Sequence, residues 1–112
     1  MKEERPWGWY EVIDKGSSYK VKSIQVDPDK SLSLQRHMHR SEHWVVVEGT
    51  ALVQVGDDKE FVNVNEGSYV PICAIHRLSN PGKIPLRIIE VQCGDYLEED
   101  DIERFDDDFG RL

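Results

Sequence analysis

Short runs of alternating or β-branched residues follow one another through the middle of the chain, and turn residues separate them. Runs of this kind, bounded by Gly, Pro, Asn and Asp, are typical of β-strands. The expected strands are residues 19–26, 31–37, 44–47, 51–55, 60–64, 68–70, 75–78 and 86–92. About eight strands at this spacing predict an all-β barrel or sandwich.

The two ends of the chain differ from this middle part. Three aromatic residues occur within residues 5–10, and we expect this segment to pack on the barrel as a lid or as an edge. Near the C-terminus, Ile102, Phe105 and Phe109 fall at i, i+3 and i+7, which is one face of a helix. Gly110 lies where a helix would stop. We therefore expect a short C-terminal helix that packs its apolar side against the barrel.

The size and composition indicate one globular domain over residues 1–112. The chain is 38% hydrophobic and 32% charged, which is typical of folded proteins. No apolar run approaches the ~20 residues of a membrane span, and the N-terminus does not resemble a signal peptide, so we expect a cytoplasmic protein without a membrane partner. Cys73 and Cys93 match no zinc-ligand spacing, and we expect both to be reduced and buried.

The formal net charge of −8 argues against nucleic acid as a partner, because binding to its phosphates requires a basic surface. It does not exclude a small phosphorylated ligand, for which two or three arginines in one pocket suffice.

Histidines are clustered with two other metal-ligating side chains. Three of the four histidines lie within seven residues, next to Gln35 and Glu42. On a strand, Gln35, His37 and His39 would share one face, and a turn after His39 could return Glu42 to the same point. Imidazole and carboxylate are good ligands for a borderline divalent ion, so the cluster predicts a metal site.

Two motifs in the chain resemble those of the cupin family. Gln35-x-His37-x4-Glu42-x6-Gly49 has the spacing of the first cupin motif, with Gln35 where many members have histidine. Residues 71–80 resemble the second motif around His76, although a cysteine replaces its usual glycine.

The closer resemblance is to the cupin domain of type II phosphomannose isomerases, which is usually the C-terminal part of a fused mannose-1-phosphate guanylyltransferase and phosphomannose isomerase. Matching segments follow in order from residues 5–8, through 42–51, to 94–105 and 108–111. The sequence contains no glycine-rich nucleotide loop, so the resemblance does not carry the guanylyltransferase activity to this chain.

The resemblance implies a cupin barrel (a double-stranded β-helix) that converts mannose 6-phosphate to fructose 6-phosphate through a cis-enediol, within GDP-mannose biosynthesis. It implies one divalent metal ion, with zinc preferred and cobalt, manganese, nickel or iron as alternatives. The implied ligands are Gln35, His37, Glu42 and His76; a rival set replaces Gln35 with His39 or His43.

Further residues are candidates for transferring the proton and for binding the phosphate. His39 is the first candidate for the catalytic base and Glu90 the second. Arg104 and Arg111 are seven residues apart, so on the expected helix they would lean together over the pocket and bind phosphate, with Arg104 close to the reaction. A pairing of Arg104 with Asp108 is the structural alternative. Additional expected contacts with the substrate are a point charge from Lys20 or Lys22 and, at the pocket rim, His43.

Other interpretations remain open at this level. A non-catalytic module that binds a sugar phosphate or sugar nucleotide is the main alternative to the isomerase. An iron dioxygenase is a third, against which Gln35 and the C-terminal resemblance argue. From the resemblance we also expect a homodimer.

Overall fold

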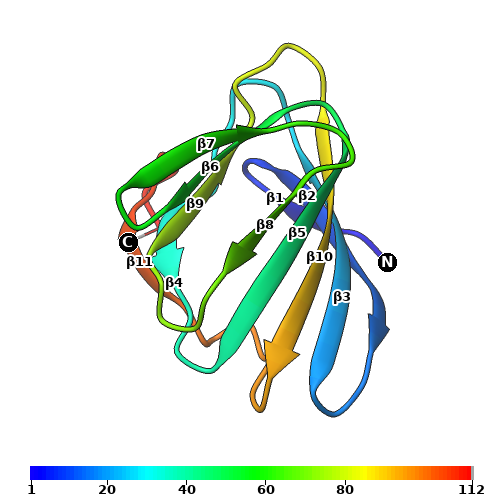
Figure 1. Cartoon of the computed structure of the whole chain (residues 1–112), viewed down its shortest axis with the longest axis vertical. Helices are drawn as coiled ribbons and strands as arrows, with labels where there is room; N and C mark the ends of the chain where they lie inside the picture. The colour runs from blue at the N-terminus through cyan, green and yellow to red at the C-terminus, as the bar shows by residue number, and fades with distance from the viewer. Residues whose placement is uncertain (112) are drawn as a thin grey trace.

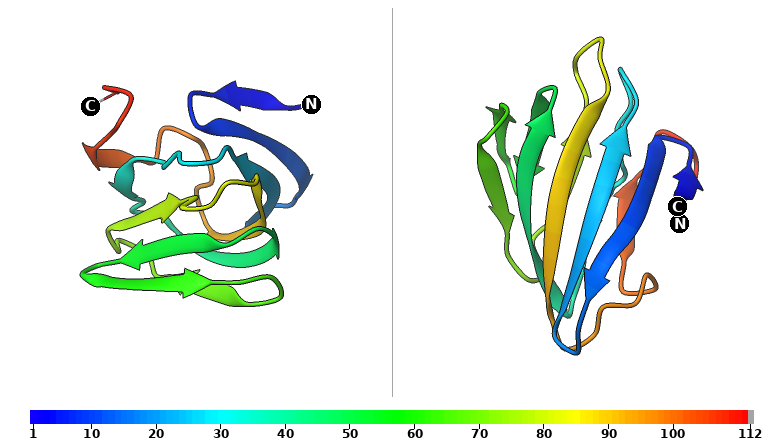
Figure 2. Two further views of the ribbon diagram at one scale, coloured as in Figure 1. Left: turned by 90° about the horizontal axis from the view of Figure 1, so that it is seen from above. Right: turned by 90° about the vertical axis from the view of Figure 1, so that its right-hand side faces the viewer.

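Two antiparallel β-sheets face each other and curl into a flattened barrel (Figures 1 and 2). The computed structural model describes residues 1–111, which contain eleven strands and no helix, and therefore no helix long and apolar enough to cross a membrane. The strands are β1 (Glu3–Arg5), β2 (Gly8–Lys15), β3 (Tyr19–Val26), β4 (Leu34–Arg36), β5 (Arg40–Glu48), β6 (Ala51–Val55), β7 (Asp58–Val62), β8 (Gly67–Val70), β9 (His76–Ser79), β10 (Leu86–Gly94) and β11 (Glu103–Asp106).

The order of the strands brings distant parts of the chain together. The six-stranded sheet has the order β1-β2-β3-β10-β5-β8, and the five-stranded sheet has the order β11-β4-β9-β6-β7. In the first sheet β10 lies between β3 and β5, where Ile88 is opposite both Ile24 and Val46. In the second, Gln35 on β4 is opposite both His76 and Arg104.

The inward side chains of three central strands change from apolar to polar halfway along the barrel. Leu86 and Ile88 on β10 are buried in the hydrophobic core, whereas Glu90 and Gln92 continue the same inward row. Because the strands alternate and lie in register, Val46 on β5 belongs to the apolar end, as do Ile24 and Val26 on β3. The barrel therefore has a hydrophobic core at one end and a polar interior at the other.

Most of the expected strands are confirmed. The structure has two further strands at the N-terminus, β1 and β2, which the sequence analysis did not predict. The bounds of β3 and β6 agree with the predicted ones, whereas β5 begins at Arg40, four residues before the predicted start. The aromatic segment 5–10 forms part of the hairpin β1–β2, which extends the six-stranded sheet at its edge. Cys73 and Cys93, expected to be buried, are unpaired and exposed.

The predicted C-terminal helix is wrong, because this segment forms β11 and pairs with β4. The edge of β4 carries backbone groups that need partners, and the C-terminal segment supplies them. Along a strand, Arg104 points inward and Phe105 points outward, so the apolar residues do not share one face. Only Phe109 of the predicted stripe packs against the hydrophobic core.

Asp107 organises the turn that follows β11. Its carboxylate accepts hydrogen bonds from Arg111 at the backbone nitrogen (2.7 Å), Nε (2.7 Å) and Nη2 (3.0 Å). These bonds, from the side chain first and then the backbone, lower the pKa of Asp107 to about 2. The expected pair of Arg104 and Asp108 is thus replaced by a pair of Arg111 and Asp107.

Replacing Asp107 with Asn should loosen this turn. We expect hydrogen exchange at the Arg111 amide to become about tenfold faster at neutral pH, since a hydrogen bond to a charged group is worth ~1.5–3 kcal/mol. Because the folded pKa lies below the usual 3.8, the stabilisation is present above about pH 4 and is lost as the pH falls towards 2. NMR can follow both effects. The exposed neighbour substitution Asp108→Asn is the control, and equal exchange in the two variants would contradict the assignment.

Candidate active site

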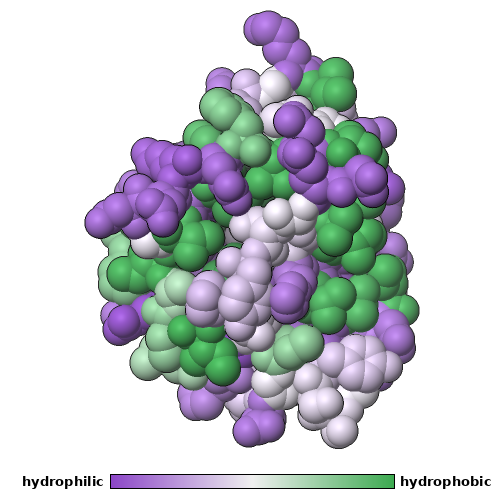
Figure 3. Space-filling view, in the orientation of Figure 1, coloured by the Kyte–Doolittle hydropathy of each residue, from purple (hydrophilic) through white to green (hydrophobic). Residues whose placement is uncertain are grey.

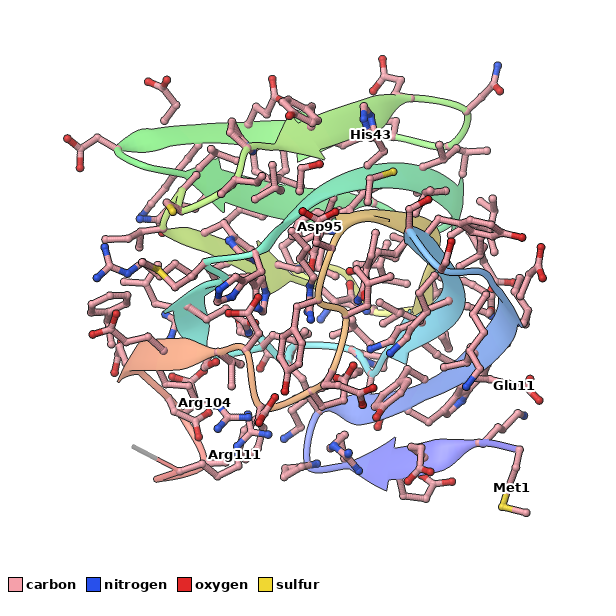
Figure 4. All side chains as sticks on the ribbon, turned by 90° about the horizontal axis from the view of Figure 1, so that it is seen from below. Met1, Glu11, His43, Asp95, Arg104 and Arg111 are labelled. Atoms are coloured by element: carbon pink, nitrogen blue, oxygen red, sulfur yellow. The ribbon has the colours of Figure 1, made fainter. Side chains whose placement is uncertain are left out.

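The polar end of the barrel opens into a pocket that both sheets line. Figure 4 shows Arg104 and Arg111 close together on one side of this region, with His43 far away on the outer side of the opposite wall. The titratable side chains that line the pocket are Arg5, Tyr10, Lys22, His37, Arg40, Glu42, His76, Glu90, Glu99, Arg104 and Arg111.

Three predicted metal ligands converge in this pocket. His37 follows β4, Glu42 lies on β5 and His76 begins β9, and each is at most 4% exposed. Their ligand atoms all lie within 4.8 Å of one another. Nε2 of His37 is 3.4 Å from one oxygen of Glu42, and Nε2 of His76 is 4.0 Å from the other. The fold thus brings together residues that are far apart in the sequence.

Both histidines are oriented for metal binding. Nδ1 of His37 is 2.6 Å from the backbone oxygen of Asp101, and Nδ1 of His76 is 2.9 Å from that of Ala74. A carbonyl oxygen only accepts, so each Nδ1 carries the proton and each Nε2 presents its lone pair to the pocket, where that of His37 is 3.3 Å from the donor Nη2 of Arg40. Burial is the main cause that lowers the pKa of His37 to about 4, and it also lowers the pKa of His76. Both rings are therefore neutral at pH 7, as metal ligands must be.

The spacing of these three groups fits a divalent ion. Bonds of ~2.0–2.2 Å to nitrogen and oxygen in a tetrahedral site place neighbouring ligand atoms about 3–4 Å apart, close to the distances between Glu42 and the two histidines. Backbone carbonyls that hold the second ring nitrogen are the usual support of metal-binding histidines. The set is accordingly suited to a metal and leaves coordination positions open.

Gln35 lies beside this group but has its own hydrogen bonds. It is opposite His76 in the pairing of β4 and β9 and is only 9% exposed. Its Nε2 donates to Oγ of Ser33 (3.0 Å), which leaves its amide oxygen as the atom that can face a ligand. Its role as a fourth metal ligand stays a prediction.

The structure does not bring the other two histidines into the pocket. The strand ends at Arg36, so the alternation that would place His39 beside His37 does not continue. The side chain of His39 is 60% exposed and contacts Asp101. His43 was expected at the pocket rim, but it lies on the outer face of β5, where its ring packs against Tyr69 with centroids 4.6 Å apart. The rival ligand sets therefore have no geometric support.

Arg40 is a pocket residue that the sequence interpretation missed. It is 5% exposed, and its Nε donates to Glu42 (2.9 Å) while Nη2 lies 3.3 Å from Nε2 of His37. Among residues 1–111, its buried Nη1 has no hydrogen-bond partner. The available signal was alternation, because Arg40 is two residues before Glu42. The predicted start of that strand at residue 44 concealed it.

Glu90 is the second buried carboxylate in the pocket. Trp44 Nε1 donates to both Glu90 and Glu42 at 3.0 Å, and Gln92 Nε2 donates to Glu90 at 2.7 Å. Burial first, and then the charge of Glu42, raise the pKa of Glu90 to about 7. Glu90, the second candidate for the base, thus lies on the inward face of β10 and lines the pocket.

The predicted phosphate ligands have different surroundings. Arg104 lines the pocket, and within residues 1–111 its buried Nε has no partner. Arg111 also lines it, held by Asp107. Lys22 is buried and bound to Glu99 at 2.9 Å, whereas Lys20 does not line the pocket and lies 3.7 Å from the same carboxylate.

Comparisons with known proteins agree on one family. Residues 1–107 match the family described as "Mannose-6-phosphate isomerase C-terminal". The chain is 57% identical over 107 residues to the alginate biosynthesis protein AlgA of Pseudomonas putida, covering 96% of the chain and 22% of AlgA. It is 56% identical over 108 residues to a mannose-1-phosphate guanylyltransferase of Escherichia coli, covering 96% and 23%. The chain thus spans less than a quarter of the length of these relatives.

Solved structures share the fold at low sequence identity. CapF, a capsular polysaccharide assembling protein of Staphylococcus aureus, has a TM-score of 0.83 at 16% identity, covering 95% of this chain and 31% of CapF. The Cnp3 cupin domain of Schizosaccharomyces pombe has a TM-score of 0.75 at 15% identity, covering 78% and 64%. These similarities confirm the all-β cupin fold, and the sequence match shows that the chain belongs to the mannose-6-phosphate isomerase C-terminal family.

Proposed function

We propose that the chain interconverts mannose 6-phosphate and fructose 6-phosphate with a divalent metal ion held by His37, Glu42 and His76. The observation that carries the proposal is the convergence of two neutral, oriented imidazoles and one carboxylate inside the pocket of a chain from this family. Zinc suits the donor set best, and Gln35 supplies a fourth ligand through its amide oxygen. When bound, the ion acts as a Lewis acid towards the oxygens on C1 and C2 of the sugar.

We assign Glu90 as the base that moves the proton between C2 and C1. In the open-chain aldose, a base removes the C2 proton while the C1–C2 double bond forms and the oxygen on C1 gains a proton. The carboxyl group then returns its proton to C1, while the oxygen on C2 gives up a proton that balances the one taken up by the oxygen on C1, which gives the ketose. Glu90 lies inside the pocket and is held by Trp44 and Gln92, whereas His39 lies outside it. One carboxyl group can perform both transfers.

The phosphate is assigned to the arginines at the pocket wall. The net charge of −8 would repel a phosphate dianion, so local cations must bind it. Within the described residues 1–111 the buried Nε of Arg104 has no partner and can donate to a phosphate oxygen, and Asp107 fixes the guanidinium of Arg111 nearby. Lys22 has a weaker case because Glu99 already neutralises it.

Removal of the metal tests the proposal as a whole. We expect the purified chain to convert mannose 6-phosphate in a coupled assay, to lose this activity in EDTA and to regain it with added zinc. His37→Ala and His76→Ala should each lose bound metal and at least about 100-fold in kcat/KM. His43→Ala, on the outer face, should behave as the unmodified protein. A folded, metal-loaded protein that is stabilised by the sugar phosphate without turnover would indicate the binding module instead.

Substitution of Glu90 with Gln should separate chemistry from binding. We expect kcat to fall by about 10²–10⁴ while metal content and KM change little, because the amide keeps the shape but cannot accept the proton. Exchange of the C2 proton with deuterated solvent, followed by NMR, should slow in parallel. His39→Ala, which removes the rival base, should retain kcat within about threefold. A larger loss in His39→Ala than in Glu90→Gln would reverse the assignment.

Arg104→Gln should weaken binding of the substrate phosphate. A charge-assisted hydrogen bond is worth ~1.5–3 kcal/mol, so kcat/KM for mannose 6-phosphate should fall about 10–100-fold, mostly through KM. Inorganic phosphate should also inhibit the variant less strongly. Arg36→Gln is the matched control, since Arg36 lies on the neighbouring β4 and pairs with Glu103 outside the pocket. Equal effects in both variants would remove Arg104 from the phosphate site.

A further inference from the structure

Trp44 lies between the two buried carboxylates of the pocket, and the proposed function gives it no role of its own. It is on β5, two residues after Glu42, so both side chains point into the barrel. In the pairing of β5 with β10, Trp44 is opposite Glu90. Its indole Nε1 donates to Oε1 of Glu42 and to Oε2 of Glu90, at 3.0 Å in each case. One N–H group is thus shared between a candidate metal ligand and the assigned base.

Packing in the hydrophobic core does not by itself account for an indole at this position. Trp44 is 4% exposed and belongs to the core, a role that a phenylalanine could also fill. A buried N–H group costs free energy unless it is bonded, and here both of its acceptors are ionisable. The ring of Trp44 also meets the ring of His76 edge to face, with centroids 5.7 Å apart. Trp44 therefore contacts two of the three candidate metal ligands as well as the base.

Donors from the protein must orient Glu90, because its side chain is only 5% exposed. Its neighbours Ile89 and Val91 point to the outside of the sheet, and Figure 3 shows hydrophobic side chains gathered on the right-hand side of the view, where Figure 1 places β10 and β3. Gln92 holds Oε1 of Glu90 at 2.7 Å and Trp44 holds Oε2, so the two donors together fix the plane of the carboxylate. A base that removes a proton from carbon depends on such an orientation.

We propose that Trp44 is a positioning residue that couples the metal site to the base, because its N–H turns from a shared bond to a bond with Glu90 when Glu42 holds a metal ion. This inference rests on the proposed function, which makes Glu42 a ligand and Glu90 the base. Oε2 of Glu42 accepts from Arg40 at 2.9 Å, so Oε1 is the oxygen that competes for the indole N–H. A cation on this carboxylate draws electron density from Oε1 and weakens it as an acceptor. The base is then fully oriented only in the metal-loaded site.

NMR of the indole N–H groups tests this coupling without turnover. The chain has three tryptophans, and the resonance that disappears in Trp44→Phe is that of Trp44. Saturation with zinc should shift this resonance. Glu90→Gln should also shift it, and by more in the zinc-loaded protein than in the metal-free protein, because the N–H then depends on Glu90 alone. The resonance of Trp9, which lies outside the pocket beside Arg87, should stay in place throughout. A Trp44 resonance that ignores zinc, or equal shifts with and without zinc, would overturn the proposal.

Replacement of Trp44 by benzothienylalanine tests its role in the reaction. This residue has sulfur in place of the N–H and keeps the shape of the ring, so the packing of the core is retained. We expect kcat to fall about 10–100-fold, as for the loss of a hydrogen bond to a charged group, while KM and bound zinc change less than about threefold. Trp44→Phe should lose kcat in the same way, and its thermal unfolding reveals any loss of packing. Trp9→Phe is the matched control and should keep the kcat of the unmodified chain.

The two measurements separate this inference from the proposed function. An unmodified chain without turnover, in which the Trp44 resonance responds to zinc and to Glu90→Gln as described, would contradict the isomerase and support the coupling. An active chain whose benzothienylalanine variant keeps full kcat would overturn the role of Trp44 and leave the isomerase intact.

Discussion

The charged side chains inside the barrel must satisfy one another, and the rest of the molecule depends on this. Lys22, Arg40, Glu42 and Glu90 are all at most 5% exposed, and an unpaired buried charge costs several kcal/mol. Each of them has an ionic or hydrogen-bonded partner in the pocket, and Trp44 joins the two carboxylates. Such a network adds little net stability, so the folding energy must come from the other end of the barrel, where Leu86, Ile88 and their neighbours form the apolar core.

The strand register fixes the positions of the candidate metal ligands. The ligands arise from three separate strands or their ends, and their positions follow from the register of β4, β5 and β9 rather than from a flexible loop. Asp101 adds a connection, because its side chain accepts hydrogen bonds from the backbone of Met38 and His39 while its carbonyl holds His37. The C-terminal segment thereby supports both the candidate metal site and the proposed phosphate site.

Much of the fold and of the metal centre could be predicted from the sequence, because both follow from local alternation and from motif spacing. The bounds of β3 and β6 and the grouping of His37, Glu42 and His76 are of this kind. The rest depends on partners that a local pattern does not contain. The C-terminal segment has a helical spacing but becomes a strand because the edge of β4 is open. Arg40 was missed and His39 was misplaced for a related reason, since the turn between β4 and β5 resets the alternation.

The same alternation explains a second feature of β10. Residues 86–92 read as apolar on both faces, with Leu86 and Ile88 on one side and Ile89 and Val91 on the other. A strand of this kind is typical of sheets that are covered on both sides. In this fold one side meets the barrel interior, part of which is polar because Glu90 and Gln92 line it. The second side keeps its apolar residues partly exposed, so the polar interior of the barrel and the apolar surface outside it are two consequences of one sequence.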